Sequence, residues 1–542
     1  MKAFSRKTIL IATLLIFHVI MLNAQSWQWA NHYGGANGDG AGNLCLDKNG
    51  NVYIFGQFFF PYAVFGKDTL VPRGVYDMFI MKMAPSGNVL WVKQAGSVDN
   101  KTNSTDVPGD LVFDESTNTI ILAGTMNGDN GLVVNCNVGG GDKIFLAKLD
   151  LNGNCLWARG VAWHGDANNV SISNDAEGNI FMAGNTKYKS TFDTNTIQPG
   201  GFIAKFGLSG SLIWVKRVLD VNGVAGQVRY FDNNLYLGGV SYNDTLKLGS
   251  ATVVCNPNDP FISKFDTNGN VIWVKTMGGP LNDNGGTISL DGTGNIYTTG
   301  EFQGTANFDN IVLDNGNKRD WYIAKYDNNG TVLWAKNAHI TGNLIYTGIS
   351  ATTSTGNIYA CGTFSGKAVF GDLAVSASSS REMFLVSYNR NGECLGVLQS
   401  PNSYHGGIAS DQNGSALLCG SFTGTTNFGN QTLKSFGASD VYVSKHDAIT
   451  STSQPLESPQ PQLLIYANPT TGISSVTIPE EFLHEKQLTL QVFDFQGKLI
   501  EKTVLTLADG KIRLNLEAQA KGIYQVALDN GRKSYTGKVV FE

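Results

Sequence analysis

The segment QSWQWANHYGG, residues 25–35, repeats a phrase that elsewhere closes long internal repeats, as in VLWVKQAGS at 89–97 and VIWVKTMGG at 271–279. Here the phrase stands before any repeat has begun. Self-similarity over several tens of residues indicates a repeat architecture. The position of this segment therefore bears on how the array of repeats begins and ends.

Residues 287–338 show the pattern of one repeat. Four short stretches of strand composition, TISLD, NIYTTGEF, WYIAKYD and TVLWAKNA, are separated by turns and loops rich in Asn, Asp and Gly. Copies of the pattern align on one glycine of the second stretch and lie 55 to 68 residues apart. The seven aligned glycines are Gly56, Gly124, Gly184, Gly239, Gly300, Gly362 and Gly420.

The seventh copy ends at VYVSKHD, residues 441–447, and lacks a fourth stretch. Aligned on its tryptophan, WQWANHYGG places Trp29 where Trp91 and Trp273 stand. A radial array of four-stranded sheets closes into a ring when both termini share one sheet, and closure removes open edges. The sequence thus predicts an all-β fold in which residues 25–447 form a seven-bladed β-propeller closed by the N-terminal strand. An open solenoid, the alternative, leaves the missing strand unexplained.

These repeats resemble the SBBP-type β-propeller repeat of secreted bacterial proteins. The shared pattern is D-x-x-G-N-x-Y-x-x-G-x-F followed by D-x-F-I-x-K-x-D-x-x-G-N-x-x-W-x-K, and it covers roughly residues 26–447. The resemblance implies the propeller fold but no particular activity, because propellers host many functions.

Composition and the N-terminus indicate an exported chain. Among 542 residues, 64 are glycine, 15% are charged, and the formal net charge is −5, which argues against nucleic-acid binding through a basic surface. Three cations precede an apolar run from Ile9 to Leu22 that is short for a membrane span. We predict a signal peptide, residues 1–24, cleaved between Ala24 and Gln25, and no transmembrane segment in the mature chain.

A linker rich in Ser, Thr, Pro and Gln, residues 448–461, ends the match to the repeat. Alternating strand patterns over residues 462–542 predict a small Ig-like β-sandwich. This tail resembles the type A C-terminal sorting domain of type IX secretion cargo from Bacteroidota, through VFDFQGKLI at 492–500, GIYQVAL at 522–528 and the motif Asn468, Pro469, Thr470, Thr471 and Gly472. The resemblance implies passage through the periplasm, recognition by the outer-membrane translocon, and removal of the tail by a sortase. The product would be secreted or held at the cell surface.

The sequence carries few signs of catalytic chemistry. No H-E-x-x-H, G-x-S-x-G or P-loop pattern occurs, and we expect no cofactor and no metal. The stretches that begin at Asp47, Asp150 and Asp266 faintly resemble calcium loops, but Asn-Gly at a hairpin favours a tight turn. A structural cation such as calcium is the alternative.

Several features recur too regularly to mark a single site. Acids stand before the third strands, and lysines lie within them, at Asp77, Asp259, Asp320 and Asp440 and at Lys82, Lys148, Lys205, Lys264, Lys325 and Lys445. Repetition in nearly every unit favours a structural role. The seven cysteines show no disulfide framework. Cys361 and Cys419 occupy equivalent positions and are expected to be small buried residues, with a bridge between them as the alternative.

Residues that break the repetition are better guides to function. Connections between a fourth strand and the next first strand usually lie on a binding face of a propeller. These connections and their surroundings hold a polar and aromatic candidate binding face of His32, Tyr33, Asp39, Asp106, Trp163, His164, Asp283, His339, Tyr404 and His405. Such a face could bind a carbohydrate, a protein or peptide, or a cation. The alternative is solvated loop residues with turn-forming Asp.

The predicted function is a non-enzymatic binding or adhesion module. The alternative is a glycan-active extracellular hydrolase or lyase that uses the same face, and a pocket with clustered acidic or His groups of shifted pKa would favour it. The triplet DTL at 68–70 and 244–246 resembles an O-glycosylation motif of Bacteroidota, which would modify Thr69 and Thr245.

Overall fold

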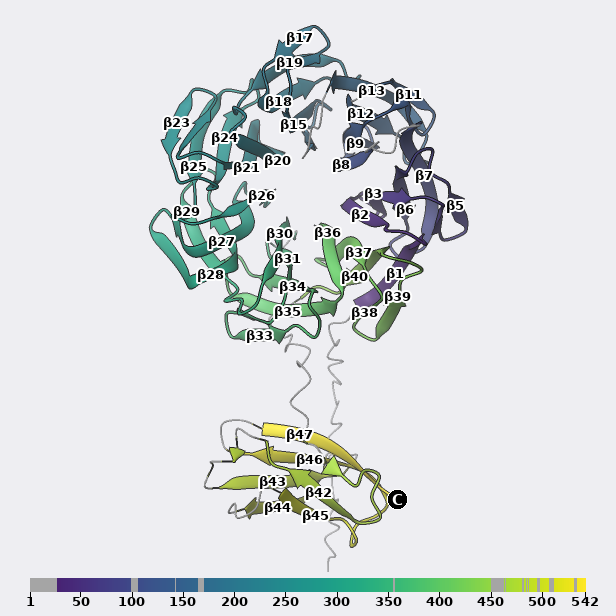
Figure 1. Cartoon of the computed structure of the whole chain (residues 1–542), viewed down its shortest axis with the longest axis vertical. Helices are drawn as coiled ribbons and strands as arrows, with labels where there is room; N and C mark the ends of the chain where they lie inside the picture. The colour runs from purple at the N-terminus through teal and green to yellow at the C-terminus, as the bar shows by residue number, and fades with distance from the viewer. Residues whose placement is uncertain are drawn as a thin grey trace, which may run out of the picture. The chain divides into compact units, whose positions relative to one another are not determined.

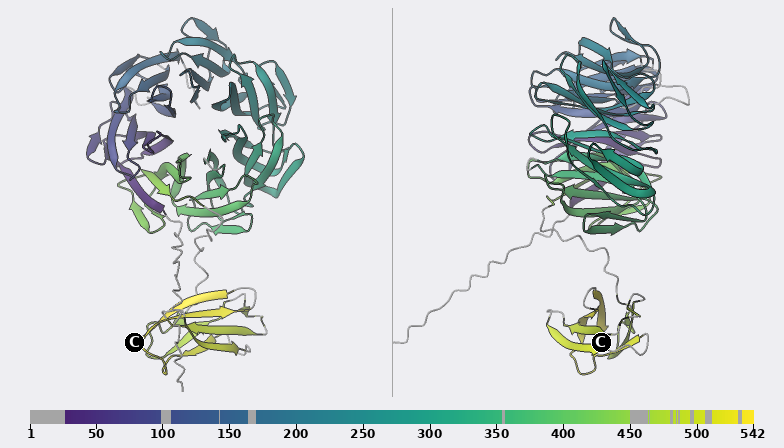
Figure 2. Two further views of the ribbon diagram at one scale, coloured as in Figure 1. Left: turned by 180° about the vertical axis from the view of Figure 1, so that it is seen from behind. Right: turned by 90° about the vertical axis from the view of Figure 1, so that its left-hand side faces the viewer.

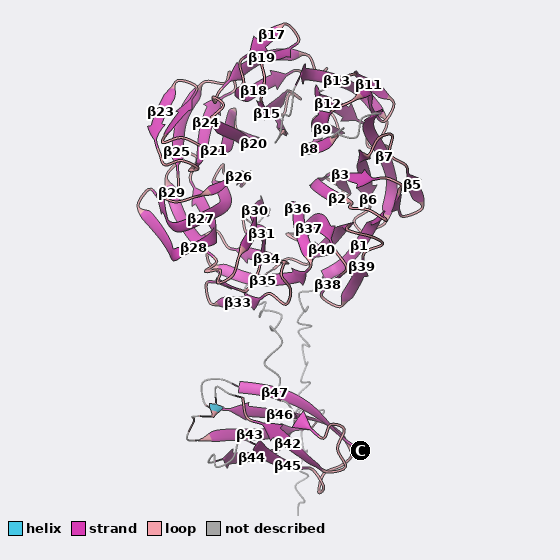
Figure 3. Ribbon diagram, viewed as in Figure 1, coloured by secondary structure: helices cyan, strands magenta, loops and turns pink. Residues whose placement is uncertain are grey.

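The computed structural model describes residues 27–98, 106–141, 143–163, 170–353, 356–449 and, with gaps at 464, 480–481, 484, 486, 495–497, 506–510 and 531–533, residues 463–542. The chain divides into an N-terminal body, Met1–Gln454, and a C-terminal domain, Pro455–Glu542. Strands dominate both parts (Figure 3). The predicted signal peptide and its cleavage site, Ala24 and Gln25, lie outside the described residues.

The described part of the N-terminal body contains seven runs of four antiparallel strands, one for each aligned repeat. We number these repeat units 1 to 7 along the chain. Figure 1 shows them side by side around a common centre, with the first strand of each unit innermost, and Figure 2 shows the same ring from behind and from the side. From the centre outward, the strands of unit 1 are β2 (Gly40–Leu46), β3 (Val52–Phe59), β6 (Tyr76–Met83) and β7 (Val89–Val98), and those of unit 2 are β8 (Val107–Asp114), β9 (Thr119–Met126), β12 (Lys143–Leu149) and β13 (Cys155–Trp163). In the same order, unit 3 has β14 (Ser171–Asn174), β15 (Ile180–Thr186), β18 (Gly200–Phe206) and β19 (Leu212–Arg217), unit 4 has β20 (Gly223–Phe231), β21 (Asn234–Ser241), β24 (Pro260–Asp266) and β25 (Val271–Thr276), and unit 5 has β26 (Asn284–Leu290), β27 (Ile296–Phe308), β28 (Ile311–Tyr326) and β29 (Val332–Asn337). Unit 6 has β30 (Leu344–Thr352), β31 (Ile358–Phe364), β34 (Glu382–Tyr388) and β35 (Cys394–Pro401), and unit 7 has β36 (Ser403–Ser410), β37 (Ala416–Phe422), β40 (Asp440–His446) and β1 (Trp27–Gly35).

The N-terminal strand β1 completes unit 7. It pairs antiparallel with β40, with Ala30 opposite Ser444. The Trp29 indole donates a hydrogen bond of 3.0 Å to the Pro85 carbonyl in a turn of unit 1, and Trp91 makes the equivalent bond to unit 2. The predicted pairing of the N-terminal strand with the last repeat is thus confirmed, and Trp29 fills the position that the alignment gave it.

Outer hairpins lie between the second and third strands of the units. In unit 5 the hairpin is a continuation of β27 and β28. The hairpins of units 1 and 2 pair with the fourth strand of the preceding unit, with Ala63 opposite Gly35 and Val133 opposite Ala95. This pairing covers strand edges that would otherwise be open. The separate hairpin strands are β4 (Ala63–Phe65) and β5 (Asp68–Leu70), β10 (Asp129–Val133) and β11 (Cys136–Gly139), β16 (Ser190–Phe192) and β17 (Asn195–Ile197), β22 (Thr245–Leu248) and β23 (Ala251–Val254), β32 (Lys367–Phe370) and β33 (Leu373–Ser376), and β38 (Thr425–Phe428) and β39 (Gln431–Lys434).

The calcium-like stretches are turns. Asp47 accepts hydrogen bonds from the backbone N–H groups of Asn49 and Asn51 at 2.9 and 3.0 Å, and its second oxygen accepts from the Asn51 amide at 2.8 Å. Asp150 and Asp266 repeat this arrangement. Both oxygens of each carboxylate therefore serve its own turn, and the described ranges hold no group of three or more His, Cys, Asp or Glu placed to bind a metal.

In the described residues, glycine-containing irregularities interrupt six of the first strands at the centre of the ring. The register shifts fall between Ala41 and Asn43, Pro108 and Asp110, Ala225 and Val228, Asn284 and Thr287, Tyr346 and Ile349, and His405 and Ile408. A Cβ atom on Gly406 of unit 7 would lie 2.1 Å from the Ala41 carbonyl oxygen of unit 1. Glycine is required there because the backbones of neighbouring units approach too closely for a side chain.

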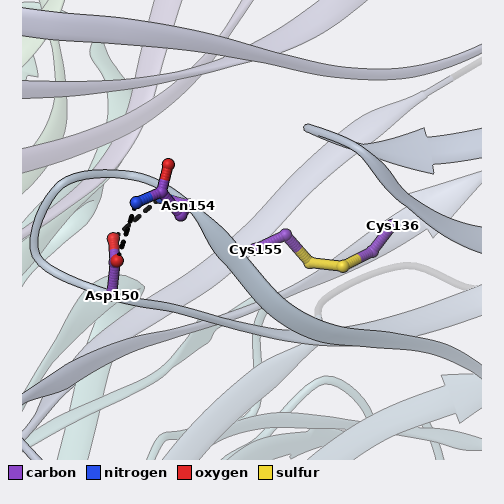
Figure 4. The surroundings of a disulfide bond; sticks show 4 residues. All are labelled: Cys136, Asp150, Asn154 and Cys155. Atoms are coloured by element: carbon purple, nitrogen blue, oxygen red, sulfur yellow. Dashed lines mark hydrogen bonds between the residues drawn. A yellow bond between two sulfur atoms is a disulfide. The ribbon is translucent and has the colours of Figure 1, made fainter.

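One disulfide, Cys136–Cys155, joins the outer hairpin of unit 2 to the start of its fourth strand, with a Cα–Cα distance of 6.1 Å (Figure 4). The cysteine spacing did not predict this bond, because the two residues lie on elements whose contact depends on how the hairpin folds back. Cys361 and Cys419 are buried, as expected, and neither forms a disulfide, so the alternative bridge between them is not formed.

The C-terminal domain contains two antiparallel sheets whose inner faces share one cluster of buried residues, including Val476 and Leu514 from one sheet and Val492 and Val526 from the other. In the described part of the chain, no helix has the length and apolar character needed to cross a membrane. The strands of the domain are β41 (Ile465–Tyr466), β42 (Ile473–Thr477) and β45 (Lys511–Asn515) in one sheet, and β44 (Leu499–Leu505), β43 (Leu488–Phe493), β46 (Gly522–Asp529) and β47 (Ser534–Phe541) in the other.

Candidate functional site

Asp320 shows what the acids before the third strands do. Asp320 accepts four hydrogen bonds, from the backbone of Trp321, His339 and Ile340 and from the Asn337 amide, all between 2.9 and 3.1 Å. Its position is fully buried. The carboxylate therefore ties the end of the fourth strand of unit 5 to its third strand, which agrees with the structural role expected from repetition.

Three acids of the predicted binding face are also buried. Asp39, Asp106 and Asp283 are 2%, 1% and 4% exposed. Asp39 accepts from the backbone N–H groups of Gly35 and Phe59 at 2.7 and 2.9 Å, and Asp283 makes the corresponding bonds in unit 5. The expectation that these carboxylates lie on an exposed face is corrected, because each is turned inward to satisfy the backbone of the connection that carries it.

These three acids form close pairs with acids that precede third strands. A Cβ on Gly278 would lie 2.4 Å from Asp259 Oδ1 and 2.5 Å from Asp283 Oδ2, so the two carboxylates flank one glycine. Burial raises the pKa of Asp283 to about 7 and that of Asp259 to about 6, and the Asp259 charge adds to the shift of Asp283. Asp39 with Asp440, and Asp106 with Asp77, repeat the pairing in other units.

The aromatic and histidine members of the predicted face are dispersed over the ring. Tyr33 is 7% exposed and packs against Phe65 in the core, so its prediction as a surface residue is corrected. His32 lies in β1, half-buried, with Nδ1 2.9 Å from Asp440 Oδ2. His339 is exposed in the connection after unit 5.

Tyr404 and His405 lie together in the first strand of unit 7. Both are half-buried. The Arg381 guanidinium lies 5.2 Å from the centre of the Tyr404 ring, and His405 Nδ1 is 3.3 Å from the Thr363 hydroxyl. His164 and the side chain of Trp163 fall outside the described residues. The structure thus gives no single cluster of the predicted residues within the described ranges.

A cavity of about 970 Å³ opens among the first strands at the centre of the ring, with walls from units 1 to 5 and 7. Its polar lining includes Asn43, Ser171, Asn185 and Gln227, and glycines of the strand irregularities supply bare backbone. The ends of second strands, such as Thr186, and the starts of first strands, such as Val107 and Asn284, also line it. The cavity therefore reaches the end of the ring at which fourth strands connect to first strands, the end that the sequence singled out.

Charged groups are few on the cavity wall within the described residues: Asp110, Lys187 and Arg229. Asp110 accepts from the backbone of Leu111 and Ile172 at 3.0 and 3.1 Å, and Arg229 lies 3.4 Å from it. None of the carboxyl groups whose pKa is raised by burial belongs to the described lining.

An aromatic side chain that lines the cavity was missed from the sequence, although the alignment contains the signal. Four residues after the aligned glycine, four units have another glycine: Gly128, Gly304, Gly366 and Gly424. Units 1 and 3 have Phe60 and Tyr188 at this offset, and unit 4 has Tyr242 one residue earlier. These three rings are 59%, 55% and 48% exposed, and Tyr242 lines the cavity.

The predicted motif of the C-terminal domain, residues 468–472, is hydrogen-bonded to the last strand, β47. The Asn468 amide donates to the Lys538 carbonyl at 2.7 Å, and its oxygen accepts from the Val540 N–H at 2.9 Å. The backbone N–H of Thr470 donates to the Val540 carbonyl at 2.7 Å, and its hydroxyl donates to the Ile473 carbonyl. Pro469, Thr471 and Gly472 complete this turn, in which Gly472 has a φ of 137°.

Residues 464–542 match the family described as the secretion system C-terminal sorting domain. This sorting domain indicates export through the type IX secretion system to the cell surface or the extracellular space, and it implies contact with that machinery. The expected localisation is therefore confirmed.

The chain also has weaker similarities to other proteins. An uncharacterized WD repeat-containing protein of Acanthamoeba polyphaga mimivirus is 25% identical over 368 residues, which cover 52% of this chain and 26% of that protein. Among solved structures, hydrazine synthase of Kuenenia stuttgartiensis has a TM-score of 0.36 at 11% identity, covering 76% of this chain and 99% of the other. A DUF4221 family member from Bacteroides vulgatus has a TM-score of 0.33 at 9% identity, covering 78% and 99%. An exotype rhamnogalacturonan lyase has a TM-score of 0.26 at 10% identity, covering 79% and 92%.

Proposed function

We propose that the N-terminal body is a seven-bladed β-propeller of the SBBP type that acts as a non-enzymatic binding or adhesion module. The secretion machinery would deliver it from a bacterium of the Bacteroidota, after loss of residues 1–24. The C-terminal domain would be an Ig-like sandwich that the translocon reads and a sortase removes. Thr69 and Thr245, on β5 and β22 of outer hairpins, are the proposed O-glycosylation sites.

The observation that carries this proposal is the chemistry of the central cavity. Its lining is rich in glycine backbone, amides and hydroxyls, and its carboxylate, Asp110, is held by backbone donors and Arg229. A pocket of this volume with a few convergent polar groups suits ligand binding. The described lining contains none of the carboxyl groups whose pKa is raised by burial, and so offers no pair of groups suited to the acid and base roles of a hydrolase.

Binding by the exported protein tests the proposal. We expect protein purified from the medium or the outer-membrane fraction to retain a glycan or a peptide on an array, and mass spectrometry should recover the bound molecule intact. Cleavage of the retained glycan would instead support the alternative, a glycan-active hydrolase or lyase.

A variant that fills the cavity locates the site. Val224 lines the cavity and is half-buried, so Val224→Trp should abolish binding. Leu333→Trp is the matched control, because Leu333 is 49% exposed on β29 and is not part of the described lining. Equal binding by both variants would contradict a site in the cavity.

A further inference from the structure

The mouth of the central cavity carries exposed apolar side chains. Val107 is the first residue of β8, Val221 precedes β20 and Tyr242 follows β21, and these side chains are 40%, 60% and 48% exposed. Val221 and Tyr242 lie close together, because the Tyr242 N–H donates to the Asn222 carbonyl at 2.7 Å. Both β8 and β20 face the centre of the ring (Figure 1). A ligand that covers these side chains removes apolar surface from water, which favours binding.

Amide groups of the same wall are held in place by the backbone. Asn185 Oδ1 accepts from the Ala225 N–H at 2.8 Å, and Asn185 Nδ2 donates to the Ala225 carbonyl at 2.8 Å. Gln227 Oε1 accepts from the Ile288 N–H at 3.0 Å. One N–H of the Asn185 amide and both N–H groups of the Gln227 amide have no partner within the described ranges, and both residues line the cavity. Donors whose geometry is already fixed are suited to bind ligand hydroxyl groups.

Two charged groups of the wall compensate one another. Arg229 Nη1 lies 3.4 Å from Asp110 Oδ2, and both groups also bond to the Ser171 hydroxyl. An anion that approached Arg229 would also approach Asp110, so this pair does not favour a charged ligand. Lys187, the remaining charged residue of the described lining, places its ammonium group 5.9 Å from the centre of the Tyr188 ring. Apolar contact and hydrogen bonding, rather than charge, are therefore the means of recognition that this wall offers.

We propose that the cavity binds the end of an uncharged glycan chain, with a sugar ring against Tyr242 and Val221 and with hydroxyl groups bonded to the Asn185 and Gln227 amides. The inference rests on the proposed binding function and assigns its ligand class. Each sugar combines an apolar C–H face with neutral hydroxyl groups, which match the mouth and the amides of the wall. Five residues separate Asn222, beside Tyr242, from Gln227, which is roughly 15 Å along an extended chain, so a ligand that contacts both contains more than one sugar.

A glycan array probed with the exported protein tests this assignment. Neutral xylo-, manno- and gluco-oligosaccharides are printed beside oligogalacturonates and peptides, and we expect only the neutral oligosaccharides to be retained. Calorimetry with a retained neutral trisaccharide should give an affinity that changes by less than about twofold between low and high salt, because no ion pair forms. Tyr242→Ala should weaken binding roughly tenfold, whereas Tyr242→Phe keeps the ring and should bind within about threefold of the parent.

Gln227→Glu keeps the acceptor for the Ile288 N–H but removes the amide donors, so it should weaken binding by about tenfold. Tyr62→Ala is the matched control and should bind as the parent does, because Tyr62 is also 48% exposed but does not belong to the described lining. Unchanged affinity in Tyr242→Ala, or equal retention of oligogalacturonates, would overturn the assignment. If only acidic glycans or peptides are retained, and Val224→Trp loses them, the ligand class is wrong and the binding function stands. If no ligand of any kind is retained, both fail.

Discussion

Asp39 and Asp440 form a pair of acids at the junction between units 7 and 1, where β1 closes the ring; we call each junction between neighbouring units a seam. This pair predicts that removing one carboxylate stabilises the protein. The two carboxylates are 2% and 0% exposed. A Cβ on Gly34 would lie 2.8 Å from Asp39 Oδ2 and 2.7 Å from Asp440 Oδ1, so these oxygens are at most about 5.5 Å apart. Asp440 Oδ2 accepts from His32 and from the Phe436 N–H, but its Oδ1 has no partner among the described residues.

The pH dependence follows from the raised pKa of Asp39. Burial, with a smaller effect from the Asp440 charge, raises this pKa from 3.8 to about 7. Between these values the folded protein holds a proton that the unfolded chain has released. The free energy of unfolding therefore falls as pH rises through this window, by about 4 kcal/mol for Asp39 alone.

Asp440→Asn should remove much of this loss. The carboxamide oxygen can take over the bonds from His32 and Phe436, while the NH₂ group stands where the unpartnered oxygen was and can donate to Asp39. The substitution removes a like charge and adds a hydrogen bond to a charged group, so we expect a gain of about 2 kcal/mol at pH 8. The gain should shrink toward pH 5, where Asp39 is protonated in the folded state.

Chemical denaturation at pH 5, 6, 7 and 8 measures this effect. All nine tryptophans lie between Trp27 and Trp334, so their fluorescence reports on the N-terminal body. Asp320→Asn is the matched control, because Asp320 holds the same place in unit 5 but has both oxygens bonded. In Asp320→Asn the NH₂ group would face N–H donors, which should lower the free energy of unfolding by about 1–3 kcal/mol. Destabilisation of Asp440→Asn to the same extent, or superimposable pH curves for it and the parent, would refute the reasoning.

Three further predictions concern the seam, the disulfide and the sorting domain. Trp27, 6% exposed in β1, packs against Phe428 with ring centres 4.9 Å apart. Trp27→Ala should lower the free energy of unfolding by about 3–5 kcal/mol, whereas Gln28→Ala, at the neighbouring exposed position, should lower it by less than about 1 kcal/mol. Equal losses would contradict the inference that packing of β1 stabilises the closed ring. Replacing both Cys136 and Cys155 by Ala removes a crosslink between residues 19 positions apart and should lower the free energy of unfolding by about 3 kcal/mol. Cys255→Ala, at a cysteine that forms no disulfide, is the control. Asn468→Ala loses two bonds to β47 and should retain the protein in the periplasm, as judged by immunoblot of cell fractions, whereas normal export would separate this turn from sorting.

The repeat carries most of what the sequence could predict about the fold. A single glycine per unit sets the alignment. The absence of a fourth strand from the seventh copy indicated that β1 takes its place, and β1 does pair with β40. The turns at Asp47 and its equivalents were also predictable, because Asn-Gly chemistry acts over a few residues. Such features depend on local sequence or on repetition, and both can be read without coordinates.

The site was less accessible to the same reasoning. Asp39 and Asp283 have the sequence surroundings of surface connections, and only the structure shows that backbone N–H groups turn them inward. The Cys136–Cys155 bond depends on the fold of one outer hairpin, which differs in length among units. Tyr242 could have been found by comparing units at one offset, because an aromatic residue near the place of a repeated glycine is unexplained by the needs of the repeat.

Among the described residues, acid pairs occur at three junctions between units, which separates their role from that of the repeat itself. Unit 5 closes onto unit 6 with Asp320 fully bonded and no second acid, so a seam can form without a pair. The pairs at Asp440 and Asp259 lie at different seams, and residues without shared partners contribute to stability additively. Combining Asp440→Asn with Asp259→Asn should therefore give, at pH 8, the sum of the two single-variant gains to within about 0.5 kcal/mol. A smaller combined gain would mean that the seams are coupled through the closed ring, as expected if strain at one seam is carried by the others.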